Sequence, residues 1–164
     1  MIVEDKNNEP FKIIAQKIKP HISIIVRNLT RGDLQKEEKV VSFIKNILNK
    51  YRVKKIIICI DSECYNYNLR LKINNILRRL RKTFKKQVIH YIIIQCAFES
   101  WIYEIITNKA APQVNSAKLK NEIRKLKRRY DIKVVREIIE NMNISMLRQI
   151  NHSFDDFVKA VRDP

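Results

Sequence analysis

The stretch KKIIICIDSE, residues 54–63, decides the fold, because an unbroken apolar run ends there in acidic residues. Five consecutive apolar residues, 56–60, are typical of a β-strand that is covered on both faces, as strands in parallel sheets are. The run stops at Asp61, and Glu63 follows two residues later. This pattern indicates a buried strand of a parallel α/β sheet, with polar side chains at its carboxyl end.

The other apolar patterns extend this strand into an α/β fold. Short apolar runs predict three more strands, over residues 2–3, 21–27 and 88–96. Amphipathic stretches predict helices, over residues 9–18, 34–51, 69–86 and 98–106, with a loop at 28–33. Later patterns are helical only, over residues 116–130, 132–142, 145–149 and 153–162. We expect a central, mainly parallel four-stranded sheet flanked by helices in a core over 1–111, and a helical extension over 112–164 packed on it as one domain.

The composition points to an anionic partner. The chain has 164 residues, 45% of them hydrophobic, and a net charge of +17. Clustered Lys and Arg gain affinity from counterion release at phosphates, so nucleic acid is the leading candidate. An anionic membrane surface, ribosomal RNA or the codon bias of an AT-rich genome would also account for the charge. No run is long enough to span a membrane and no signal peptide is visible, so we expect a cytoplasmic protein.

The glycine and cysteine content argues against two common kinds of binding site. Gly32 is the only glycine, which argues against a glycine-rich loop around phosphates. Cys59, Cys64 and Cys96 lack the CxxC spacing of zinc sites, and two of them fall in apolar runs. We expect neither a disulfide nor a zinc site.

Acidic residues follow three of the predicted strands. Glu4 ends the first, Asp61 and Glu63 end the third, and Glu99 lies just beyond the fourth. If the first and third strands are neighbours, Glu4 faces Asp61 and Glu63, and a cation would relieve their repulsion. Hard oxygen ligands suit Mg²⁺ or Mn²⁺. The alternatives are structural: Asp61 or the serine after it could cap the next helix, and Glu99 could simply begin a helix near its positive dipole end.

Two segments carry a family resemblance. IVEDKNNEPF at 2–11, followed by IIICIDSE at 56–63, resembles the Toprim domain of topoisomerases, primases and OLD-family nucleases. Glu4 matches the family glutamate, Asp61 the first Asp of the DxD motif, and Glu63 stands at its second Asp. The chain departs from the pattern at Asp5, which replaces the usual glycine, and at Glu63, which is longer by one methylene. FESWIYEII at 98–106 and INHSFDDFVKAV at 150–161 resemble segments of small OLD-like Toprim proteins.

The resemblance implies a Rossmann-like Toprim fold and a metal-dependent nuclease that hydrolyses DNA or RNA with Mg²⁺ or Mn²⁺. It makes Asp61 and Glu63 metal ligands, Glu4 a ligand or the acid/base, and Glu99 a candidate ligand of a second metal. The separate tyrosine domain of topoisomerases and the zinc-binding apparatus of primases are absent from the sequence. The competing hypothesis is a non-catalytic basic module that binds nucleic acid and keeps a degenerate Toprim fold.

Two predicted helices have strongly basic faces. Residues 69–86 contain no acidic residue, and residues 118–129 contain only Glu122. Solvated helices usually mix charges, so these faces are expected to contact phosphates with little sequence specificity, although ordinary solvated faces remain the alternative. The candidate residues are Arg70, Arg78, Arg79, Arg81, Lys82, Lys85, Lys86, Lys120, Arg124, Lys127 and Arg128. The sequence leaves open whether the chain acts alone or as a homodimer.

Overall fold

The computed structural model, which describes residues 1–4, 8–64 and 67–163, has an all-parallel four-stranded sheet at its centre. The strand order is β2-β1-β3-β4. The strands are β1 (Ile2–Val3), β2 (Arg27–Asn28), β3 (Lys55–Asp61) and β4 (Val88–Ile94). The expected α/β class is therefore confirmed, and the sheet is compatible with a Rossmann-like fold.

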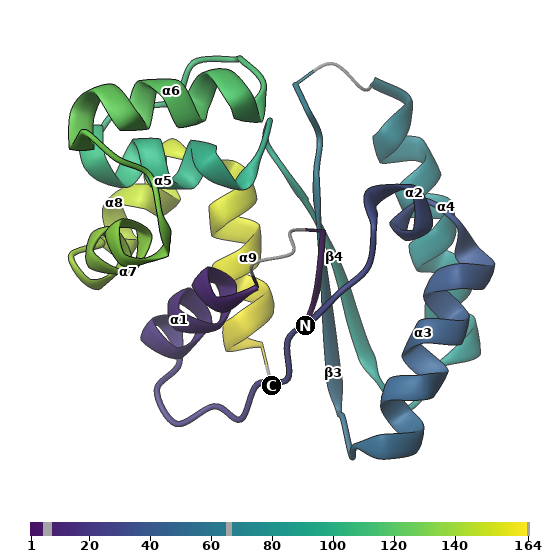
Figure 1. The fold of residues 1–164 in the computed structure, drawn as a ribbon. Helices are drawn as coiled ribbons and strands as arrows, with labels where there is room; N and C mark the ends of the chain where they lie inside the picture. Colours follow the sequence, from purple (N-terminus) through teal and green to yellow (C-terminus); the bar gives the residue numbers. More distant parts are fainter. Residues whose placement is uncertain (5–7, 65–66, 164) are drawn as a thin grey trace.

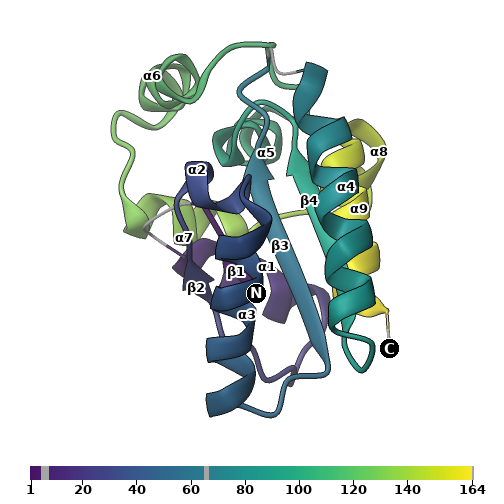
Figure 2. The same ribbon diagram turned by 90° about the vertical axis from the view of Figure 1, so that its right-hand side faces the viewer.

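Helices cover both faces of this sheet (Figure 1). On one face lie α2 (Arg31–Leu34), α3 (Glu37–Lys50) and α4 (Tyr67–Thr83). On the other lie α1 (Glu9–Ile18), α5 (Phe98–Thr107), α6 (Ser116–Lys127), α7 (Ile132–Glu140), α8 (Ile144–Ile150) and α9 (His152–Arg162). Figure 2 shows the molecule after a quarter turn, so that α3 and α4 lie in front and α9 lies behind α4.

Strand β3 is buried on both faces, as its apolar run predicts. Ile57 and Cys59 belong to the core on the α1 and α9 side, whereas Ile56, Ile58 and Ile60 belong to the core on the α3 and α4 side. Successive side chains of a strand point to opposite faces, so one continuous apolar run supplies both cores.

Several predicted elements end a few residues away from their expected bounds, and two differ more. Of the strand expected over 21–27, only Arg27 is in a strand, because β2 covers Arg27 and Asn28. The partner strand β1 has two residues and pairs only with these two. The helix expected over 34–51 begins earlier and is split. Thr30 Oγ1 accepts a hydrogen bond from Asp33 N, which starts the short α2 inside the expected loop. The backbone N–H of Gln35 then closes this turn, and α3 starts two residues later.

The C-terminal helices share a core with the sheet. Trp101 of α5 packs against Phe154 and Phe157 of α9, with ring centroids 5.2 and 5.3 Å away. Phe11 of α1 joins the same cluster, 6.0 Å from Trp101. The indole Nε1 donates to Ser153 Oγ at 3.1 Å. Within the part of the chain that the structure describes, no helix has both the length and the apolar character of a membrane span.

Candidate carboxylate site

Glu4 and Asp61 meet at the carboxyl edge of the sheet. Strands β1 and β3 are parallel neighbours, with Val3 opposite Cys59, so the residues that follow them emerge side by side. The backbone N–H of Asp61 donates to Glu4 Oε2 at 3.1 Å. Both residues are partly buried. The expected adjacency of the first and third strands is confirmed, and it places two of the three predicted acids together.

The carboxylate of Asp61 has a structural partner as well. Its Oδ1 accepts a hydrogen bond from Phe98 N, at the first turn of α5, at 3.1 Å. Next to it, Ser62 Oγ accepts from Cys96 N at 2.8 Å. Capping is thus part of what these two side chains do. These contacts hold the turn after β4 and the first residue of α5.

Glu63 contacts a different partner from Glu4 and Asp61. Its backbone has a positive φ of 52°, and its side chain is 57% exposed. The carboxylate forms an ion pair with Arg31, the first residue of α2. Arg31 Nε is buried and has no hydrogen-bond partner among the described residues. Sequence reasoning missed Arg31, because it lies in a segment that reads as a loop and meets Glu63 only through the sheet topology.

Glu99 is buried and faces α6. Only 4% of its side chain is exposed. It accepts hydrogen bonds from Ser116 Oγ at 2.9 Å and Tyr130 Oη at 3.3 Å, and Lys120 Nζ lies 3.2 Å away. Its partners therefore include Lys120, one of the predicted phosphate contacts. Within residues 1–4, 8–64 and 67–163, no three His, Cys, Asp or Glu side chains are grouped closely enough to hold a metal ion.

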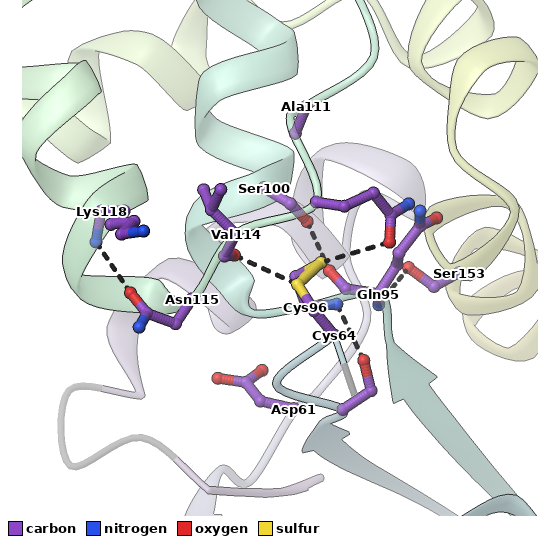
Figure 3. The surroundings of a disulfide bond; sticks show 12 residues. Asp61, Cys64, Gln95, Cys96, Ser100, Ala111, Val114, Asn115, Lys118 and Ser153 are labelled. Atoms are coloured by element: carbon purple, nitrogen blue, oxygen red, sulfur yellow. Dashed lines mark hydrogen bonds between the residues drawn. A yellow bond between two sulfur atoms is a disulfide. The ribbon is translucent and has the colours of Figure 1, made fainter. Parts of the chain in front are cut away.

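A disulfide next to the site overturns the expectation of free cysteines. Cys64 and Cys96 are bonded, with Cα atoms 4.1 Å apart (Figure 3). Cys59 is the one free cysteine. Asp61 pairs with Ile94 in the β3–β4 ladder, so the two cysteines follow neighbouring strands by three and two residues. CxxC spacing could not reveal this pair, because the two cysteines are 32 residues apart in sequence and meet only at the sheet edge.

A second buried carboxylate, Glu104 of α5, was also missed. It accepts hydrogen bonds from Ala111 N at 3.0 Å and from Asn151 Nδ2 at 2.7 Å. Burial raises the pKa of Glu104, and these two hydrogen bonds act in the opposite direction. Asn151 in turn caps α9 by accepting from Phe154 N. Glu104 therefore ties α5 to the start of α9, and an amphipathic helix pattern gives no sign of such a link.

The predicted basic residues differ in their partners. Arg79 forms an ion pair with Glu37 at 2.7 Å, and Arg81 donates to Ile89 O at 3.2 Å. Lys82 of α4 and Lys85 in the turn after it are exposed, and the structure gives them no partner among the described residues. Exposed cations without an acidic neighbour keep their charge available for phosphates.

Comparison with known proteins gives no relative: no protein-family model, no curated protein and no solved structure matches the chain.

Proposed function

We propose that the protein is a metal-dependent nuclease of the Toprim type that hydrolyses phosphodiester bonds of DNA or RNA, with Glu4 and Asp61 at the centre of its site. The observation that carries this proposal is the contact between Asp61 N and Glu4 Oε2 at the carboxyl edge of a parallel sheet. Ligands of open α/β sheets bind at this edge. Two acids there would repel an approaching phosphate unless a cation lies between them.

The two carboxylates fit a hard divalent cation. Mg²⁺ is commonly bound through one or two carboxylates, and water and substrate phosphate oxygens complete its shell. Glu4 and Asp61 provide that minimal set of oxygen donors, and both are oriented by their contacts with backbone N–H groups. When bound, Mg²⁺ or Mn²⁺ would supply positive charge at the phosphate and lower the pKa of an attacking water.

The remaining acids have different roles in this proposal. Glu63 reaches the site only by leaving its ion pair with Arg31, a change that its exposure makes easy. Arg31 is then available to bind a phosphate oxygen, because a guanidinium fits phosphate as well as carboxylate. Glu99 is occupied by α6, so we assign it to positioning Lys120 and not to a second metal.

The second candidate function is a nucleic-acid-binding protein without catalysis. It is favoured by the contacts of Glu63 with Arg31 and of Asp61 with Phe98, which engage two of the three acids. The basic residues on α4 and α6 would serve such a protein unchanged.

We also propose that the protein acts in the cytoplasm, where its nucleic-acid substrates are found. Glutathione and thioredoxin keep most thiols reduced in that compartment. Cys64 and Cys96 would then exist there as a dithiol, and the disulfide would form on exposure to oxidant.

The test of the proposal is cleavage of labelled single- and double-stranded DNA and RNA with Mg²⁺, with Mn²⁺ or with EDTA. We expect cleavage of at least one substrate with a divalent cation and none with EDTA. Glu4→Gln should abolish cleavage, whereas Glu38→Gln, the same charge change on the exposed face of α3, should leave it unchanged. Binding of every substrate without cleavage of any would select the non-catalytic candidate.

A further inference from the structure

The outer edge of β4 lies in a groove between two helices. Among the residues that the structure describes, β4 is the last strand of the sheet, and no strand pairs with its outer side. Helix α4 packs on one face of β4 and α9 on the other (Figure 1). A hollow of about 630 Å³ is lined by both helices and by His90, Tyr91 and Ile92 of the strand. A second hollow of about 540 Å³ adjoins it on α4, and the two share Leu77 and Arg81.

Cations from separate parts of the chain line this groove. Helix α4 contributes Arg81 and Lys82, and the turn after it contributes Lys85. The opposite wall contributes Arg148, Lys159 and Arg162, which the sequence did not single out. Acidic residues of the lining are Asp156 and Asp163. The lining therefore carries a net positive charge, most of it on the α4 side, because the acids offset most of the charge on the opposite wall.

Three of these cations are available to a ligand. Lys82, Lys85 and Arg162 are exposed, and no hydrogen bond or ion pair engages them among the described residues. By contrast, Arg148 Nε and Lys159 Nζ share Asp155, at 2.6 and 2.7 Å. Available cations on both walls can contact the same polyanion at once, which a single basic helix cannot arrange.

Arg81 makes the groove more suitable for a polyanion than for another strand. Its Nε and Nη2 both donate to Ile89 O, at 3.3 and 3.2 Å, on β4. This contact occupies a carbonyl that edge pairing with a second copy would use, and charged residues along an edge disfavour such pairing. A guanidinium has five N–H donors, so Arg81 keeps others for a phosphate while its position is fixed.

We propose that this groove, formed by α4, the outer edge of β4 and α9, binds the phosphate backbone of a nucleic-acid strand. The inference rests on the proposed nucleic-acid partner and not on cleavage. It places an anchoring surface along the side of the sheet, whereas Glu4 and Asp61 lie at its carboxyl edge. Binding there holds the nucleic acid through its backbone, without reading its bases.

The test measures binding of a fluorescein-labelled single-stranded oligonucleotide in EDTA as NaCl is varied. The groove variant replaces Lys82, Lys85 and Arg162 by Gln. The logarithm of the binding constant falls with the logarithm of the salt concentration, with a slope of about −0.7 for each phosphate contact on a single strand. Three lost contacts should therefore make the slope less steep by about 2. The same relation gives about 50-fold weaker binding at about 0.15 M salt.

A matched control removes equal charge elsewhere. Lys12, Lys45 and Lys133 are exposed residues of α1, α3 and α7, and their replacement by Gln should weaken binding by less than about threefold through long-range charge alone. Equal weakening by both triple variants, or unchanged binding by the groove variant, overturns the proposal. If the groove variant loses binding to phosphatidylserine vesicles but still binds the oligonucleotide like the wild-type protein, the groove binds a membrane surface and the proposal is wrong.

Two further measurements keep the result interpretable. If circular dichroism shows that the triple variant is unfolded, the double variant at Lys82 and Lys85 replaces it, with an expected loss of about 10-fold. Asp61→Asn should retain full binding even where it removes cleavage. Failure of the groove and failure of the nuclease are therefore seen in different assays.

Discussion

Removing the disulfide should destabilise the protein substantially. The bond between Cys64 and Cys96 closes a loop across 32 residues. Loss of loop-closure entropy from the unfolded chain makes such a crosslink worth about 3.5 kcal/mol. Small domains unfold at a total cost of about 5–15 kcal/mol, so this is a large share. We expect the double variant with Ser at both positions to unfold at a markedly lower urea concentration than the oxidised protein.

The assay compares urea unfolding curves of the oxidised protein, the reduced protein and the Ser variant. Reduced protein and variant should agree within about 1 kcal/mol, because the loop is open in both. Thiol titration in denaturant without reductant should find one thiol, that of Cys59. Three titratable thiols in protein purified under air, or equal stability of the oxidised protein and the variant, would refute the reasoning.

Two more predictions concern Arg31 and Glu104. Arg31→Gln should lower the free energy of unfolding by less than about 1 kcal/mol, because the partner Glu63 is 57% exposed and exposed ion pairs contribute little. A loss of more than about 2 kcal/mol in urea unfolding would contradict this. Burial raises the pKa of Glu104 above its ordinary value of 4.5, so the folded state binds more protons than the unfolded state. The stability that this group contributes therefore falls as the pH rises from 4.5 through the folded pKa. Relative to Glu104→Gln, the wild-type protein should therefore lose stability over that range, and a gain would show that the hydrogen bonds from Ala111 and Asn151 outweigh burial.

Local patterns predicted the elements that depend on local chemistry. The apolar run before Asp61 was sufficient to place a doubly covered strand, and parallel strands bring their carboxyl ends to one edge, which placed Glu4 beside it. The helix 9–18 was predicted with its observed bounds, because its apolar stripe and Pro10 give both its buried face and its start.

The parts that were missed depend on long-range contacts. Whether Cys64 meets Cys96 depends on the order of β3 and β4 in the sheet, and neither residue carries a local sign of it. The ion pair of Glu63 with Arg31 depends on α2 lying over the sheet edge, in a segment that reads as a loop. The basic groove likewise combines the basic α4, which the sequence did indicate, with α9, whose two acidic and two basic residues give no such sign.

The most direct test of the central claim is the single-turnover cleavage rate of Asp61→Asn with Mg²⁺ or Mn²⁺. Asparagine keeps an oxygen that can accept from Phe98 N, so the fold and nucleic-acid binding should be preserved. The substitution removes the negative charge that would hold the cation. We predict a rate at least about 100-fold below that of wild-type protein, with unchanged oligonucleotide affinity. Cleavage by Asp61→Asn at the wild-type rate would contradict a nuclease site built on Glu4 and Asp61.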